Sequence, residues 1–166
     1  MVRKHQRGVT LVEMLLVTAI IGSIVMVGPK IVTNVTKIFI LNKAKLELQE
    51  QARAIMYVIT REIRQAQSST IRITRQTNSQ PFYSYITFRK TGSTTDLTFY
   101  QSGSNLIMLT GTKSTILSKN LAYLAFTFPR SDDMTIISVS MTLQQQIYGG
   151  AMKALHMASE RIRVMN

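Results

Sequence analysis

A single carboxylate, Glu13, interrupts an otherwise uncharged apolar segment that runs from Val9 to Pro29. The part without any charge, from Met14 onward, falls somewhat short of the roughly 18–20 residues that cross a bilayer, but the segment is long enough when counted from Val9. Glu13 is therefore expected inside a membrane-spanning helix. An ionised carboxylate there costs about 2.5–3.5 kcal/mol on insertion scales, so we expect a positive group to neutralise it.

The positive group could be a new amino terminus. If the chain were cut after Gly8, the amine of Val9 would lie four residues before Glu13. Residues at this spacing share one helix face and are about 6 Å apart along the axis. Such an amine and carboxylate can pair within one chain or, if two helices slide by about one turn, between neighbouring chains. The second arrangement would order the subunits of an assembly.

The segment around this acid reads Gly8-Val9-Thr10-Leu11-Val12-Glu13, after a short basic leader and before an apolar helix. It resembles the signal of type IV prepilins and type II secretion pseudopilins. The resemblance implies that a prepilin peptidase cuts between Gly8 and Val9 and methylates the Val9 amine. It also implies that Glu13 meets the Val9 amine of an adjacent subunit as a filament grows. Gly8 and Glu13 match the family pattern, whereas Val9 replaces the usual phenylalanine.

Two other interpretations of the apolar segment remain open. One is an ordinary secretory signal, although the segment ends in Val25-Met26-Val27-Gly28-Pro29, which is not a small-x-small cleavage site. The other is a plain membrane anchor in which Glu13 has no role, although acids inside membranes are rarely without function. Both are weaker than the prepilin interpretation, because neither explains why the glycine, the acid and the long helix occur together.

The composition leaves room for one domain beyond the membrane segment and argues against an enzyme. The 166 residues include no cysteine, which excludes disulfides, thiolate catalysis and cysteine-ligated metals. His5 and His156 have no carboxylate pair at metal or acid–base spacing. A calcium site at Asp132-Asp133 is a minor alternative to a plain turn, because calcium takes six or more oxygens. We expect no enzymatic activity, cofactor or metal.

The net charge is +12 and becomes +9 without the three basic residues of the leader, since 17 basic residues then face 8 acidic ones. Such an excess permits contact with nucleic acid or with anionic lipid. Contact with lipid headgroups is enough to explain the lysines that follow the apolar segment, which are Lys30, Lys37, Lys43 and Lys45. These lysines also offset the leader, so charge alone does not fix the orientation. The resemblance implies a single-pass protein of the bacterial inner membrane with its globular part outside the cytoplasm.

An amphipathic helix is predicted to continue the membrane segment. The apolar positions after Pro29 recur with a mean spacing near 3.6 residues and are Leu41, Ala44, Leu48, Ala52, Ile55, Ile59, Ile63 and Ala66. With the membrane part they predict one helix from about Val9 to Gln67, roughly 88 Å long. Gly22, Gly28 and Pro29 are its expected bends, because glycine lowers helix propensity and proline removes a backbone hydrogen bond.

The remainder of the chain is predicted to be strands and turns. The strands are expected at 70–75, 83–89, 97–101, 106–110, 115–117, 121–128, 135–143 and 161–165. In 121–128, the face expected to pack on the helix carries Ala122, Leu124, Phe126 and Phe128. The stretch 144–160 is broken by Gly149-Gly150, and 151–158 is expected to be a short helix or a loop.

The predicted fold class is α+β and pilin-like, with a long N-terminal helix packed on a mostly antiparallel sheet. The predicted division is a leader 1–8, a transmembrane and filament-core helix 9–29, its amphipathic continuation 30–67, and a β-rich domain 68–166. The end of the helix, with Glu62, Ile63, Arg64 and Ala66, resembles minor pilins and pseudopilins of the J or W type. An ordinary amphipathic helix would use the same residue types.

The sequence therefore predicts a structural minor pilin or pseudopilin of a type IV pilus or type II secretion filament. Its partners would be the prepilin peptidase, other pilin or pseudopilin subunits and inner-membrane lipid. The alternative is a DNA-binding competence pseudopilin or a filament-tip module that binds a secreted substrate. A basic contact patch for that role would be Arg72, Arg75, Arg89 and Lys90. The same residues could instead form a solvated sheet edge that discourages aggregation.

Overall fold

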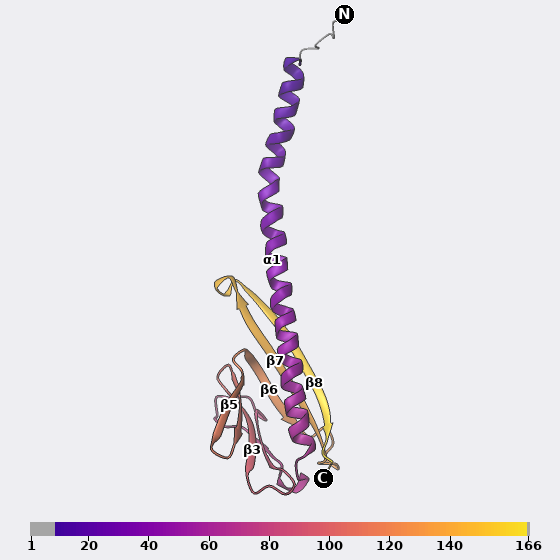
Figure 1. Ribbon diagram of the computed structural model, residues 1–166, viewed down its shortest axis with the longest axis vertical. Coiled ribbons are helices and arrows are strands. Elements are labelled where there is room, and N and C mark those ends of the chain that lie inside the picture. The colour runs from indigo at the N-terminus through magenta and orange to yellow at the C-terminus, as the bar shows by residue number, and fades with distance from the viewer. Residues whose placement is uncertain (1–8, 166) are drawn as a thin grey trace, which may run out of the picture. The chain divides into compact units, whose positions relative to one another are not determined.

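The computed structural model describes residues 9–165 of the chain, which divide into two compact units at the Ile40–Leu41 junction. One α-helix, α1 (Leu11–Arg64), supplies most of the first unit and continues into the second (Figure 1). The predicted long helix is confirmed, and it begins and ends slightly inside its predicted limits. It runs without interruption through Pro29.

In the first unit, the large apolar side chains of α1 are not covered by any other part of residues 9–165. Every large apolar side chain from Val9 to Phe39 is exposed. The hydroxyl groups of this part bond back to helix carbonyls, as Thr18 does to Met14 and Ser23 to Ile20. Internal satisfaction of polar groups suits a helix in lipid, where no water is present to satisfy them.

In the second unit, α1 buries the face that the periodicity predicted. Ala44, Leu48, Ala52, Ile55, Ile59 and Ile63 are all buried there. They join a core with apolar residues of two sheets, including Phe88, Phe99, Phe126, Val139 and Ile162. The α+β class, with an apolar helix on antiparallel sheets, is thus confirmed.

The first sheet has five antiparallel strands in chain order. These are β1 (Arg72–Thr74), β2 (Tyr85–Arg89), β3 (Asp96–Ser102), β4 (Asn105–Thr110) and β5 (Lys113–Ser118). A 3-10 turn, η1 (Ser68–Thr70), connects α1 to β1. Positive backbone φ angles at Gly103 and Gly111 allow the tight turns on either side of β4.

The second sheet has three antiparallel strands, β6 (Leu121–Thr127), β7 (Ile136–Ile147) and β8 (Met152–Arg163). The antiparallel strands were predicted to form one sheet, whereas the structure has two. Strand patterns indicate which residues share a face, but they do not specify where pairing stops between two neighbouring strands.

The prediction of a short helix or loop at 151–158 was wrong. Residues 152–158 belong to β8, which pairs with β7 in unbroken register from Ile136–Arg163 to Ile147–Met152. The turn between them, η2 (Tyr148–Gly150), has positive φ angles at all three residues. Gly149-Gly150 is thus a hairpin turn. The strand was obscured because its buried residues, Ala154 and Ile162, are also spaced at multiples of four, as on a helix face.

The predicted face of β6 was correct only in part. Leu124 and Phe126 are fully buried as expected, but Ala122 is exposed and Leu121 is buried. The register with β7 shifts between Leu121 and Tyr123. Such an irregularity inserts an extra residue and reverses the faces of the residues before it.

Candidate processing and assembly site

The site begins at the N-terminal turn of α1, where Thr10 and Glu13 cap the helix reciprocally. The backbone N–H of Thr10 donates to Glu13 Oε2 at 2.8 Å, and the Thr10 hydroxyl donates to the same oxygen at 3.0 Å. In return, the Glu13 backbone N–H donates to Thr10 Oγ1 at 3.3 Å. This is a capping box, which satisfies donors that a helix start otherwise leaves without partners.

The capping box was missed in the sequence, although its signal was present. Threonine followed three residues later by glutamate, directly before an apolar run, is the usual pattern. Glu13 was interpreted as an isolated charge, so no role was predicted for Thr10. Of the two residues predicted to form the processing site, Val9 is exposed, and Gly8 lies outside the described residues.

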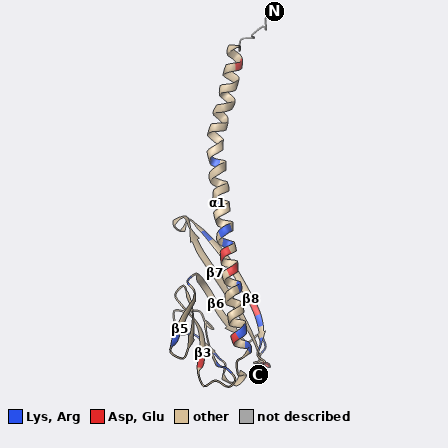
Figure 2. Ribbon diagram, in the orientation of Figure 1, with Lys and Arg blue, Asp and Glu red and all other residues tan. Residues whose placement is uncertain are grey.

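The helix that follows the cap is long and apolar enough to cross a membrane. Figure 2 shows that its first part carries almost no charge apart from Glu13, whereas lysine, arginine and glutamate gather farther along α1. The described geometry is thus an exposed apolar helix with one capped carboxylate at its start.

In the comparison with protein families, residues 3–28 match the model described as the prokaryotic N-terminal methylation motif. The chain carries a prepilin-type methylation motif. The matched segment contains the predicted cleavage residues Gly8 and Val9, and also Glu13. No curated protein and no solved structure matches the chain.

The predicted bend residues lie in or beside the methylation motif. Gly22 and Gly28 are inside it, and Pro29 follows directly. A Cβ atom added at either glycine would meet no atom within 4 Å, so packing within the chain does not require glycine there. The bend remains a prediction, since α1 continues through all three positions.

Beyond the methylation motif, the end of α1 is joined to β2 by a buried acid that the sequence did not reveal. Glu62 is 5% exposed and forms ion pairs with Lys90 and, at 2.8 Å, with Arg61. Burial raises the pKa of Glu62, but the hydrogen bonds from Lys90 and Arg61 outweigh it and hold the pKa below its usual value. Backbone hydrogen bonds reinforce the junction, since the Gln67 N–H donates to the Arg89 carbonyl at 2.9 Å.

The four residues of the predicted basic contact patch have different surroundings. Lys90 pairs with Glu62, and Arg89 pairs with Asp96 at 3.0 Å. Arg75 lies over the ring of Phe82, with its Cζ 4.2 Å from the ring centroid. Arg72 and Arg89 line one polar cavity with a volume of about 400 Å³. Of the four residues, Arg72 and Arg89 therefore share a cavity, whereas Lys90 is held in its ion pair with Glu62.

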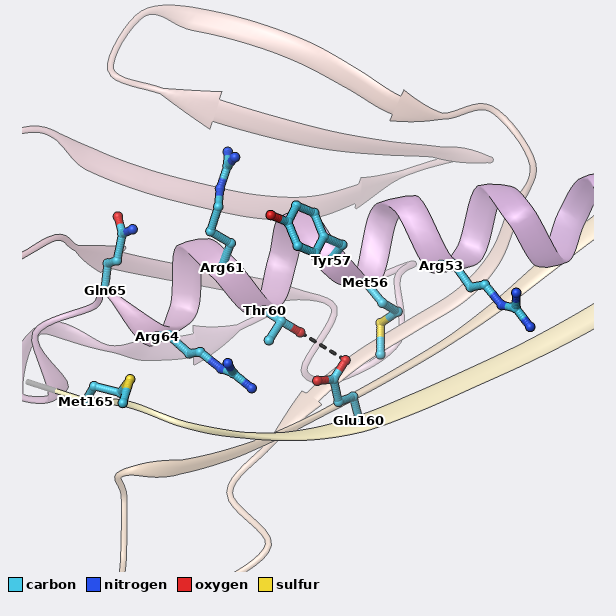
Figure 3. A pocket seen from close by; sticks show the side chains of 9 residues that line it. All are labelled: Arg53, Met56, Tyr57, Thr60, Arg61, Arg64, Gln65, Glu160 and Met165. Carbon is cyan, nitrogen blue, oxygen red and sulfur yellow. Dashed lines mark hydrogen bonds between the residues drawn. The ribbon is translucent and has the colours of Figure 1, made fainter.

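A larger cavity of about 720 Å³ lies between the end of α1 and β8. Figure 3 shows Glu160 of β8 pointing toward α1, with Arg53 and Arg64 on either side of it. The Thr60 hydroxyl donates to Glu160 Oε2 at 3.0 Å. The cavity was not predicted, because Glu160 closes the stretch that the sequence left without strand structure. The other side chains that line it are Met56, Tyr57, Arg61, Gln65 and Met165.

The two aspartates considered for calcium bond to their own loop. Asp132 pairs with Arg130 at 2.9 Å, and Asp133 accepts both the backbone N–H and the hydroxyl of Thr135. The hydrogen bonds from Thr135 lower the pKa of Asp133. Within residues 9–165, no group of three metal-binding side chains comes together. His156 lies on β8, and His5 is outside the described residues.

Proposed function

We propose that the protein is a structural subunit of a type IV pilus or a type II secretion filament, in the manner of a minor pilin or pseudopilin. A prepilin peptidase would remove residues 1–8 and methylate the Val9 amine. The mature chain would cross the bacterial inner membrane once, with its globular part outside the cytoplasm. The observation that carries this proposal is the methylation motif at 3–28, together with Glu13 at the start of a helix whose large apolar side chains are exposed as far as Phe39.

The exposed apolar part of the helix would hold the subunit in the membrane and would later pack against other subunits in a filament. In the membrane, lipid covers its apolar side chains; in a filament, neighbouring helices replace that lipid. The hydrophobic effect does not favour one register over another between helices in lipid, because lipid tails are as apolar as leucine. A single carboxylate in an otherwise uncharged helical segment would set a register, since it favours the position that brings a positive group to it. Glu13 and the Val9 amine of the next subunit are the proposed pair.

Proteins that carry this kind of signal are in general structural rather than enzymatic, which agrees with a subunit role. The J or W subgroup is the proposed subtype, on the similarity at Glu62, Ile63, Arg64 and Ala66. The burial of Glu62 and its ion pairs supply a physical reason for an acid at that position.

The test is incorporation of a Glu13→Ala variant into filaments, with Glu47→Ala as the matched control. Glu47 is an exposed acid on the same helix, outside the apolar segment. We expect Glu13→Ala to stay in the membrane, because removing the acid makes insertion more favourable, and to be absent from filaments. Normal incorporation of Glu13→Ala would contradict the pairing mechanism.

A second function is supported by one observation. The cavity lined by Arg72 and Arg89 lies at the rim of the five-stranded sheet and also contains three hydroxyl-bearing residues. Contact with DNA or with a secreted substrate, in a competence machine or at a filament tip, is therefore the alternative proposal.

A further inference from the structure

The outer face of the five-stranded sheet carries a straight row of side chains across all five strands. The register aligns Thr74, Tyr85, Tyr100, Ile107 and Ile116, one from each strand in order. The alternate residues Ile86, Phe99 and Leu106 are fully buried in the core. Because successive side chains of a strand point to opposite faces, the aligned row points away from the core.

Two tyrosines form the centre of this row. The rings of Tyr85 and Tyr100 have centroids 5.9 Å apart and are inclined by 35°. Both residues are only partly buried, and Ile116, at the β5 end of the row, is 51% exposed. Paired aromatic rings on an open sheet face resemble the surfaces on which RNA-binding sheets stack unpaired bases.

A polar cavity lies beside the tyrosine pair on the same face. It has a volume of about 400 Å³ and is lined by Ser69, Thr70, Arg72, Thr87, Arg89 and Asp96. Thr87 follows Tyr85 by two residues, so the cavity begins about 7 Å along the strand from the ring row. Arg72 lies directly opposite Thr87.

The charges in the cavity favour an anion. Asp96 is its one acid and is engaged by Arg89 at 3.0 Å, whereas Arg72 forms no ion pair within residues 9–165. Arginine and hydroxyl groups are the usual donors to phosphate oxygens. The mature chain also carries an excess of nine positive charges, which attracts a polyanion from a distance.

We propose that this face binds single-stranded nucleic acid, with bases on Tyr85 and Tyr100 and a backbone phosphate in the Arg72–Arg89 cavity. A single strand fits better than a duplex, because rings that lie on a sheet reach only bases that are unstacked and unpaired. Sequence preference is low, since every base offers a stacking face. The inference rests on the alternative proposal of DNA contact at the Arg72–Arg89 cavity and specifies its ligand as a single strand. It can fail separately from the filament role, because binding is measured on dispersed protein without assembly.

The experiment uses the full chain in detergent micelles and a fluorescent single-stranded oligothymidylate, with anisotropy as the readout at several salt concentrations. The test variant is Tyr85→Leu/Tyr100→Leu, which keeps apolar side chains but removes the rings. Tyr123→Leu is the matched control, because Tyr123 is an exposed tyrosine on β6 of the other sheet. We expect the dissociation constant to rise at least about tenfold in the double variant and to stay unchanged in the control.

A second variant, Arg72→Gln, tests the phosphate contact separately and leaves both rings in place. It is expected to weaken binding and to reduce the slope of log affinity against log salt by about 0.7, the contribution of one phosphate contact. Absence of binding at low salt would overturn the proposal. Equal affinity for a duplex, or full binding by the double tyrosine variant, would also overturn it and would leave the row as a surface for a protein partner.

Discussion

Glu13 Oε2 lies 2.8 Å from the backbone nitrogen of Thr10, three residues earlier, and 3.0 Å from its hydroxyl oxygen. The carboxylate is therefore partly satisfied by its own helix in the separate subunit. Both of these bonds reach Oε2, and Oε1 accepts none within residues 9–165. A carboxylate can accept several hydrogen bonds, so one oxygen can remain on the cap while the other meets an amine from a neighbour.

This arrangement predicts that loss of the cap and loss of the charge affect incorporation into filaments differently. Thr10→Val removes the hydroxyl but keeps the backbone N–H and the branched shape, at a cost of about 0.5–2 kcal/mol to the helix start. We expect this variant to be processed and incorporated at reduced yield, whereas Glu13→Ala is not incorporated. The measurement is the fraction of each variant in purified filaments. The opposite order of the two variants would show that the cap, and not the charge, directs docking.

The Glu62–Lys90 ion pair is predicted to stabilise the second unit. Lys90→Met removes one partner of a buried carboxylate, and we expect a loss of about 1–3 kcal/mol in the free energy of unfolding. Lys113→Met is the control, because Lys113 is an exposed lysine at the start of β5 with no ion pair within residues 9–165. Denaturant unfolding of the full chain in detergent measures both, and equal stability of the two variants would exclude a stabilising role.

The same acid predicts a pH dependence. The pKa of Glu62 is lower in the folded chain, so the folded state favours the ionised form and the unfolded state binds the proton more readily. The resulting stabilisation is present above the unfolded pKa of about 4.3 and is lost as the pH falls through the folded pKa. The stability difference between wild type and Glu62→Gln should therefore shrink as the pH falls below about 4.3. A difference that is constant with pH would contradict this account, and Glu47→Gln serves as the exposed control.

The packed face of α1 predicts unequal costs for two neighbouring truncations. Ile59 is fully buried, and Ile59→Ala is expected to cost about 2–5 kcal/mol through lost burial and a cavity. Tyr57 is 68% exposed on the same helix, and Tyr57→Ala should change the free energy of unfolding by no more than about 0.5 kcal/mol. Similar effects at both positions in thermal unfolding would mean that the described face does not form the core.

Two turn glycines provide a matched comparison of strain. Gly103 and Gly111 have nearly equal φ angles of 59° and 60°. A Cβ at Gly111 would lie 3.1 Å from Thr95 Cγ2, whereas one at Gly103 would meet nothing within 4 Å. Both alanine variants should lose about 1–2 kcal/mol from the left-handed backbone, with the larger loss at Gly111. Equal losses at the two positions would show that Thr95 moves aside at no cost, and a smaller loss at Gly111 would contradict the prediction.

Local patterns predicted the elements of this fold well. The helix could be predicted because the segment before Pro29 is apolar throughout and long enough to span a membrane, and because the apolar residues after Pro29 recur at the helical spacing. Most strands were visible because alternating residues such as Ile86 and Phe88 are bounded by turn residues. The β7–β8 hairpin was missed because Gly149-Gly150 was interpreted as an interruption and because the small residues of β8 do not distinguish a strand period from a helix period.

Contacts between residues far apart in the sequence could not be predicted from these local patterns. The burial of Glu62 depends on Lys90, which lies 28 positions later and reaches the acid only because β2 ends beside the helix end. The Tyr85–Tyr100 pair depends on the register between β2 and β3, and a shift of one residue would abolish the pair. For the candidate site, the residues of the motif and their expected roles could be predicted from the sequence, but the hydrogen bonds from Thr10 to Glu13 were not predicted.

The most direct test of the filament-subunit proposal is the N-terminal residue and intact mass of the protein extracted from membranes, with and without a co-expressed prepilin peptidase. The account predicts a chain that begins at Val9, with an added methyl group, only in the co-expressed sample. A chain that keeps Met1–Gly8 in both samples would contradict it and would favour a simple membrane-anchored β-domain.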